Sequence, residues 1–126
     1  MKEKDPNVID PHEPGAKLDD GKVLAGVLAD FSYALQAVAV VGTFGARKYS
    51  RGGWQKVDAG EERYTDALWR HLLAERHEEK DPDSGLLHAA HLAWNALARL
   101  ELFLRAESQR DSLMELLFTR RQRMQR

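Results

Sequence analysis

The 126-residue sequence contains no cysteine, which excludes disulfide bonds, thiolate zinc sites and a cysteine nucleophile. It also lacks a P-loop, a dinucleotide-binding glycine motif and the Gly-x-Ser-x-Gly turn of serine hydrolases. Neither sign of charge dominates, because 19 Lys and Arg residues are balanced by 20 Asp and Glu residues. Net charge therefore gives no reason to expect a nucleic-acid partner or an anionic membrane.

Long hydrophobic runs are missing as well. The most apolar stretch, Ala34–Val41, is much shorter than the ~20 residues that a membrane-spanning helix requires. The charged N-terminus has no apolar segment of the signal-peptide type. From these features we expect a soluble cytoplasmic protein that does not enter a membrane.

Proline is almost confined to the beginning of the chain, where three of the four prolines occur, at positions 6, 11 and 14. Few apolar side chains accompany them, so residues 1–21 are predicted to form a flexible or extended N-terminal arm. Residues 22–126 are long enough for a single domain with its own core. No segment shows the regular alternation of a strand, which makes this domain all-α.

Four helices are predicted from apolar residues that recur at helical spacing. The first begins near Lys22 and is interrupted by Gly42 and Gly45, and the glycines that follow Arg51 place Tyr49 and Trp54 on a kink or loop. The others run from about Gly60 to His77, from Pro82 onwards, and from Ser108 or Asp111 to the arginines near the C-terminus, with Leu113, Leu116, Leu117 and Phe118 on an apolar face. Four helices in a chain of this length indicate a four-helix bundle.

The third helix has the clearest predicted start. Asp81 suits the N-cap, Pro82 suits the first helical position, and Asp83 and Ser84 suit the first turn. The connector to the preceding helix, His77–Lys80, is short. The second and third helices should therefore form an antiparallel hairpin.

A row of polar side chains lies on the apolar stretch Leu86–Leu104. His88, His91 and Asn95 occupy positions i, i+3 and i+7, which share one face of a helix. Apolar residues cover the other faces, so the helix is predicted to be buried. Because an unpaired buried polar group costs roughly 1–3 kcal/mol, this row requires a hydrogen-bond network, a metal or a ligand.

The second helix carries a matching polar row. His71, Glu75 and Glu78 fall at i, i+4 and i+7, and the predicted hairpin places Glu75 opposite His88 and His71 opposite His91. Carboxylates and imidazoles that converge in a helical bundle commonly bind divalent metals. Carboxylates suit Mg²⁺ or Mn²⁺, whereas two imidazoles favour Mn²⁺, Fe or Zn²⁺. The alternative is that these groups only hydrogen-bond to one another or form a solvated face.

Several ordered motifs resemble a known family. They are Gly45-Ala46-Arg47-Lys48-Tyr49, Trp54, Arg63–Leu72 with its Arg70-His71 pair, Glu78, and Asp81-Pro82-Asp83-Ser84-Gly85 followed by His88, His91 and Asn95. Together with Lys17, Asp19, Gly21 and Lys22, they resemble the phage and bacterial dATP/dGTP diphosphohydrolases. Those enzymes are small all-α relatives of the MazG-like nucleoside triphosphate pyrophosphohydrolases. The resemblance spans roughly residues 17–104.

The resemblance implies a metal-dependent cleavage of dATP or dGTP into the monophosphate and pyrophosphate. The implied catalytic residues are Glu78, His71 and His88, and the implied ligands of Mg²⁺ or Mn²⁺ are Glu75, Glu78, Asp81 and Asp83. The implied substrate-binding residues are Lys22, Lys48, Tyr49, Trp54, Arg63, Arg70, His91 and Asn95, with the cations facing phosphates and Tyr49 or Trp54 stacking on the base. The wider superfamily carries a second acidic pair where this chain has His88 and His91.

The implied partners are a purine-favoured dNTP substrate and further copies of the chain in a dimer or tetramer, with no membrane and no stably bound nucleic acid. A phage-encoded member would act in the host cytoplasm. Two alternatives remain at this stage. One is a different metal-dependent nucleotide phosphohydrolase, and the other is a non-catalytic helical module for oligomerisation or binding.

Overall fold

The computed structural model describes residues 3–106, 111–112 and 114–117 of the chain. Within them it contains three α-helices, α1 (Ser32–Lys48), α2 (Gly60–Ala74) and α3 (His88–Arg105), and two 3₁₀ helices, η1 (Ala25–Phe31) and η2 (Gly53–Lys56). The described part has no strand beyond a single antiparallel bridge between Lys80 and Leu87. The all-α prediction is confirmed, whereas the packing of four helices into a bundle stays a prediction.

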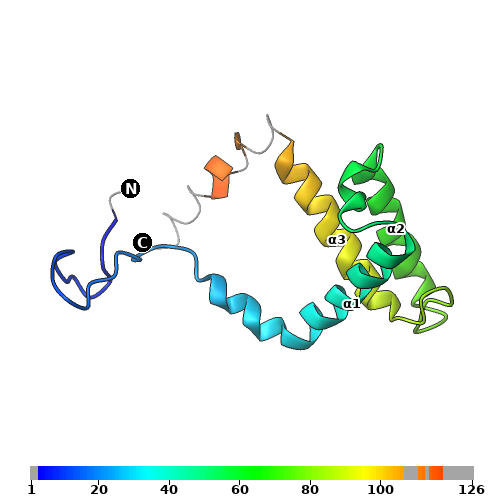
Figure 1. Ribbon diagram of the computed structural model, residues 1–126, viewed down its shortest axis with the longest axis horizontal. Coiled ribbons are helices and arrows are strands. Elements are labelled where there is room, and N and C mark those ends of the chain that lie inside the picture. Colours follow the sequence, from blue (N-terminus) through cyan, green and yellow to red (C-terminus); the bar gives the residue numbers. More distant parts are fainter. Residues whose placement is uncertain (1–2, 107–110, 113, 118–126) are drawn as a thin grey trace.

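Helices α2 and α3 form the antiparallel hairpin that the sequence predicts (Figure 1). The C-terminal half of α1 crosses one end of this pair and packs mainly against α3. Helix α1 can approach α3 closely because Gly42 has no side chain. A Cβ atom on Gly42 would lie only 3.1 Å from the indole nitrogen of Trp94. Helix α1 continues through Gly42 and Gly45 to Lys48, so the predicted interruption there is wrong, and Gly42 serves close packing instead of a break.

The predicted start of the third helix is also wrong. The helix begins at His88 and not at Pro82, and α2 ends at Ala74 and not at His77. Residues 75–87 form a longer connector, in which Asp81 uses its side chain to hold a turn instead of capping a helix. Gly85 has a φ of +72°, a left-handed conformation that ends any helical continuation at this point.

The inward face of α3 carries polar or small side chains. Its buried residues are His88, Ala90, His91, Asn95 and Ala98. Two of its leucines, Leu97 and Leu100, are about half exposed (50% and 48%). The prediction that apolar side chains bury this helix on all sides is therefore wrong, because the polar row itself is the surface that faces α2 and α1.

From residue 3 to residue 24, the N-terminal arm contains turns and no helix. Asp5 organises it by accepting a hydrogen bond from the backbone N–H of Asn7 at 2.6 Å. Lys22, which the resemblance places among the substrate-binding residues, belongs to this part of the chain and forms an ion pair with Glu3 at 3.2 Å.

The helical segment Ala25–Lys48 is long and apolar enough to cross a membrane, judged by length and composition alone. The expectation based on the shorter run Ala34–Val41 underestimated the length of the apolar helical segment, because η1 and α1 are continuous. Val41 is the one buried residue of this fully described segment. Figure 1 shows η1 projecting away from the α2–α3 pair.

The predicted fourth helix is only partly within the described residues. Residues 111–112 and 114–117 are helical, in agreement with the prediction. Leu113, Phe118 and the C-terminal arginines lie outside the described part.

Candidate active site

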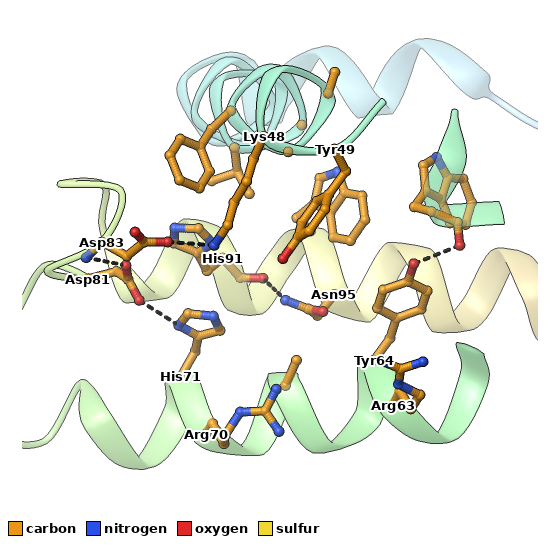
Figure 2. A pocket seen from close by; sticks show the side chains of 18 of the residues that line it. Lys48, Tyr49, Arg63, Tyr64, Arg70, His71, Asp81, Asp83, His91 and Asn95 are labelled. Atoms are coloured by element: carbon orange, nitrogen blue, oxygen red, sulfur yellow. Dashed lines mark hydrogen bonds and ion pairs between the residues drawn. The ribbon is translucent and has the colours of Figure 1, made fainter. Parts of the chain in front are cut away.

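A cavity of about 870 Å³ lies between α1, α2, α3 and the two loops that flank them. This volume is within the range of small-molecule sites, which is roughly 300–1,000 Å³. Of the predicted site residues, its lining includes Lys48, Tyr49, Trp54, Arg63, Arg70, His71, Glu78, Asp81, Asp83, His88, His91 and Asn95. The fold thus brings together most of the residues that the sequence singled out (Figure 2).

Two predicted residues are absent from this lining. Glu75 caps the C-terminus of α2 and is exposed, so Glu78 and not Glu75 is the carboxylate beside His88. The one-face prediction for His71, Glu75 and Glu78 is wrong because α2 ends before the two glutamates. Lys22 lies in the N-terminal arm, where its partner is Glu3.

One end of the cavity is a cluster of imidazoles. The rings of His71 and His91 are stacked, with centroids 4.5 Å apart and planes 9° apart. His71 Nδ1 also lies 2.9 Å from His88 Nδ1, so one of these nitrogens donates and the other accepts. His88 is the most buried of the three, at 3% exposed, and its Nε2 lies 3.4 Å from Glu78 Oε1.

Burial controls the protonation of this end. It lowers the pKa of His71, and the neighbouring His91 lowers it further. Burial likewise lowers the pKa of His91. Both imidazoles therefore favour the neutral form, which can accept a proton or bind a metal ion.

Asp81 joins the cluster from the connector. Its Oδ1 accepts hydrogen bonds from the backbone N–H groups of Asp83 and Ser84, both at 2.9 Å. Burial alone would raise the pKa of Asp81, but these two hydrogen bonds hold it below the ordinary value. The carboxylate is consequently ionised, and its Oδ2 lies 4.0 Å from His71 Nδ1.

Cationic side chains line the same cavity. Lys48, at the C-terminus of α1, forms an ion pair with Asp83 at 2.7 Å, which raises the pKa of Lys48. Arg63 and Arg70 project from α2, as Figure 2 shows. Since each is exposed and charged, the cavity presents positive groups beside the imidazole and carboxylate end.

The other end of the cavity is aromatic. Trp54, Tyr64 and Trp94 contact one another edge to face, with centroids 5.6–6.3 Å apart. The Tyr64 hydroxyl donates to the carbonyl of Trp54 at 2.6 Å, which fixes η2 on α2. Tyr49, which is exposed, also lines the cavity (Figure 2).

Asn95 lies between the two ends and is only 6% exposed. Its Nδ2 donates to the carbonyl of His91 at 2.8 Å. An amide buried in a cavity wall can also offer its carbonyl oxygen to a ligand. Asn95 is therefore placed to hydrogen-bond with a molecule that fills the space between the imidazoles and the aromatic rings.

Sequence reasoning missed four residues of this site. Trp94 and Tyr64 form its aromatic end, Ser84 bonds through Oγ to His91 Nε2 at 2.6 Å, and Phe44 contacts the His91 ring edge to face. Tyr64 and His71 are seven residues apart on α2, a spacing that already placed them on one face. The partnership of Ser84 with His91 had no sequence signal, because it depends on how the connector folds.

Comparisons with known proteins connect the chain to one family. The family described as "dATP/dGTP diphosphohydrolase, N-terminal" matches residues 12–112. A Salmonella phage PMBT28 protein named "dATP/dGTP diphosphohydrolase" is 39% identical over 80 residues, which cover 63% of this chain and 26% of that protein. The match thus spans about a quarter of the relative's length. No solved structure matches the chain.

Proposed function

Because this chain belongs to the dATP/dGTP diphosphohydrolase family, we propose that it hydrolyses purine deoxynucleoside triphosphates to the monophosphate and pyrophosphate with the help of a divalent cation. The observation that carries the proposal is the single cavity that joins an aromatic end to an end rich in imidazoles and carboxylates. A nucleoside triphosphate also has two chemically different ends, a flat aromatic base and a chain of charged phosphates.

The aromatic end suits a base. The exposed ring of Tyr49 and the Trp54–Tyr64–Trp94 cluster offer π-faces and ring edges, against which aromatic groups pack favourably. The larger area of a purine would gain more from this contact than a pyrimidine. Asn95, at the boundary between the two ends, is in a position to select the sugar or the edge of the base.

The polar end suits the triphosphate. Phosphoryl transfer gains mostly from positioning and from neutralisation of charge, which Lys48, Arg63 and Arg70 can supply. A divalent cation bound here would supply further neutralisation and activate water. The water oxygen bonds to the α-phosphorus, the bond to the bridging oxygen breaks, and pyrophosphate leaves. We assign Glu78 as the acceptor of the proton from that water, since its carboxylate lines the cavity.

The direct test uses the full chain with each dNTP and NTP in the presence of Mg²⁺ or Mn²⁺, with products separated by ion-exchange chromatography or ³¹P NMR. Release of pyrophosphate and dAMP or dGMP is expected. Release of orthophosphate alone would instead support another type of nucleotide phosphohydrolase. Absence of any product from a folded, metal-loaded chain would support the non-catalytic helical module.

A matched pair of variants connects the reaction to the site. Glu78→Gln removes the proposed proton acceptor and should lower kcat by about 10²–10⁴-fold. Glu79→Gln changes the adjacent exposed glutamate, which is not part of the cavity lining, and should leave kcat unchanged. Equal activity in the two variants would remove Glu78 from the mechanism.

We further propose that the chain works as a homo-oligomer that buries the outer face of η1 and α1. Large apolar side chains are exposed there, among them Leu28, Phe31 and Tyr33. Exposed apolar patches of this kind mark surfaces that another protein can cover.

A second copy fits this face better than a lipid bilayer. The C-terminal part of the same segment forms a wall of the cavity, with Gly42 against Trp94 and Lys48 paired to Asp83. A spanning orientation would pull this wall out of the site. Exposed apolar side chains at Met114, Leu116 and Leu117 offer a further surface that another copy could cover. An assembly of this kind would act on the nucleotide pool of the cytoplasm.

A further inference from the structure

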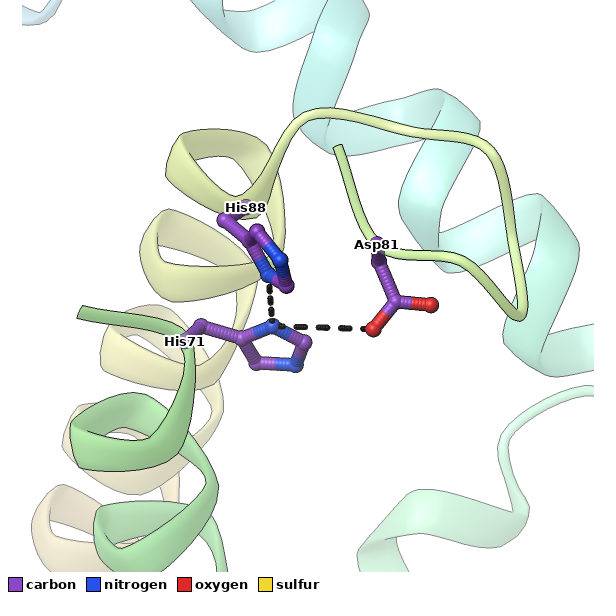
Figure 3. Close-up of side chains that lie close together, drawn as sticks. All are labelled: His71, Asp81 and His88. Carbon is purple, nitrogen blue, oxygen red and sulfur yellow. Dashed lines mark hydrogen bonds and ion pairs between the residues drawn. The ribbon is translucent and has the colours of Figure 1, made fainter. Parts of the chain in front are cut away.

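Three side chains from separate parts of the hairpin converge at the polar end of the cavity. His71 comes from the last turn of α2, His88 is the first residue of α3, and Asp81 lies in the connector between them (Figure 3). One potential ligand atom from each lies within 4.8 Å of the other two. The fold therefore assembles two imidazoles and one carboxylate from residues that are not neighbours in sequence.

The distances between these ligand atoms are similar to those between two atoms that bind the same metal ion. Two atoms bound to the same cation at ~2.1 Å lie about 3.0–4.2 Å apart for bond angles between 90° and 180°. The His71 and His88 Nδ1 atoms are 2.9 Å apart, and His71 Nδ1 is 4.0 Å from Asp81 Oδ2. The ligand atoms of His88 and Asp81 lie within 4.8 Å of each other, a limit slightly above that range, so the three groups surround a common centre.

Asp81 and His88 also have support on the side away from that centre. Asp81 Oδ1 is held by the backbone N–H groups of Asp83 and Ser84, which leaves Oδ2 to face His71. The Nε2 of His88 is 3.4 Å from the Glu78 carboxylate. Metal-binding histidines usually have a carboxylate or carbonyl on the second ring nitrogen, and such partners orient the ligand.

We propose that His71, Asp81 and His88 bind one divalent first-row transition-metal ion and select it over Mg²⁺. Imidazole nitrogens favour ions such as Mn²⁺, Fe²⁺, Co²⁺ and Zn²⁺, whereas Mg²⁺ prefers oxygen ligands and retains its water. This set replaces the all-carboxylate set that the resemblance implied, in which Glu75 is not among the residues that line the cavity. Three protein ligands leave coordination positions for water or a phosphate oxygen.

The catalytic role of this ion rests on the function proposed above. Binding of the ion itself requires no nucleotide. The competing account is a metal-free hydrogen bond in which one Nδ1–H of the two imidazoles donates to the other Nδ1. That account satisfies His71 and His88 without an ion and predicts no ordered metal binding.

The test is a titration of the metal-stripped full chain with Co²⁺, monitored by visible absorption, together with metal analysis after dialysis. We expect one Co²⁺ per chain, with absorption bands of a nitrogen- and oxygen-ligated ion. Zn²⁺ should displace it, whereas an excess of Mg²⁺ of about a hundredfold should not. A folded chain that binds no Co²⁺, or one in which Mg²⁺ competes equally, would overturn the proposal.

Variants locate the ion. His71→Asn and Asp81→Asn each remove one ligand, and each should weaken Co²⁺ binding at least about tenfold. The amide introduced by Asp81→Asn keeps an oxygen acceptor for the turn. His77→Asn provides the matched control, because His77 is an exposed histidine of the connector outside the cavity lining. Far-UV circular dichroism verifies folding. Undiminished Co²⁺ binding in both ligand variants would place the ion elsewhere and overturn the proposal.

The outcomes separate the two proposals. Hydrolysis with Mg²⁺ by a chain that binds no Co²⁺ would overturn this site and leave the proposed reaction standing. Stoichiometric Co²⁺ binding that depends on His71 and Asp81, in a chain that hydrolyses no dNTP, would support the site and overturn the reaction.

Discussion

Gly42 of α1 lies so close to Trp94 of α3 that a Cβ atom on Gly42 would come within 3.1 Å of the indole Nε1. Trp94 has little freedom to move away, because Trp54 and Tyr64 contact it edge to face at centroid distances of 5.8 and 5.6 Å. The approach of α1 to the hairpin and the position of the aromatic end are thus linked through one glycine.

Gly42→Ala is expected to lower the melting temperature. Alanine gains about 1 kcal/mol of helix propensity over glycine, but overpacking against a fixed ring costs roughly 1–3 kcal/mol. Gly45→Ala is the control on the same helix, since nothing lies within 4 Å of its added Cβ, and it should raise the melting temperature. Thermal unfolding by circular dichroism measures both, and equal stabilisation by the two changes would refute the packing argument.

Lys48→Met should weaken substrate binding with little effect on stability. The ion pair with Asp83 is exposed, and pairs of this kind add little to stability. A phosphate-facing cation would instead appear as a higher KM and a weaker dependence of KM on salt concentration. Lys56→Met removes an equal charge outside the cavity lining. If both variants changed KM equally, the effect would be one of net charge and not of the site.

Asn95→Leu should raise KM for the preferred dNTP by about tenfold, the equivalent of one lost hydrogen bond of roughly 1.4 kcal/mol. The substitution keeps approximate volume but removes both polar atoms of a buried amide in the cavity wall. Steady-state kinetics with several dNTPs and NTPs would show whether the loss depends on the sugar or the base. A uniform loss in kcat with no change in KM or selectivity would argue against substrate contact by Asn95.

Phe31→Asp should reduce the oligomer to smaller species. Phe31 is 59% exposed on η1 within a single chain, so a charge there costs little in a monomer but would be buried in an interface between copies. Light scattering coupled to size-exclusion chromatography measures the mass. Val8→Asp introduces the same charge at an exposed apolar residue of the N-terminal arm and should leave the mass unchanged. A wild-type chain that is already monomeric, or association that depends on added lipid vesicles, would contradict the interface.

Much of the site could be predicted because its residues follow local rules. The spacing of His88, His91 and Asn95 places them on one face of any helix, and the hairpin then turns His88 and His91 toward His71. The motifs that resemble the family contain most of the residues that line the cavity. Helical periodicity and side-chain chemistry require only near neighbours in sequence, so a single chain carries them in readable form.

The sequence by itself determined an all-α chain with an imidazole row on one helix and His71 on the preceding helix. Only the tertiary structure decided that Asp81 serves a turn and not an N-cap, that Glu78 and not Glu75 lies beside His88, and that Ser84 holds His91. The physical reason is that the same short polar side chain stabilises a helix start and a turn equally well. The choice between them depends on the left-handed Gly85 and on the Lys80–Leu87 bridge, which local preference does not encode.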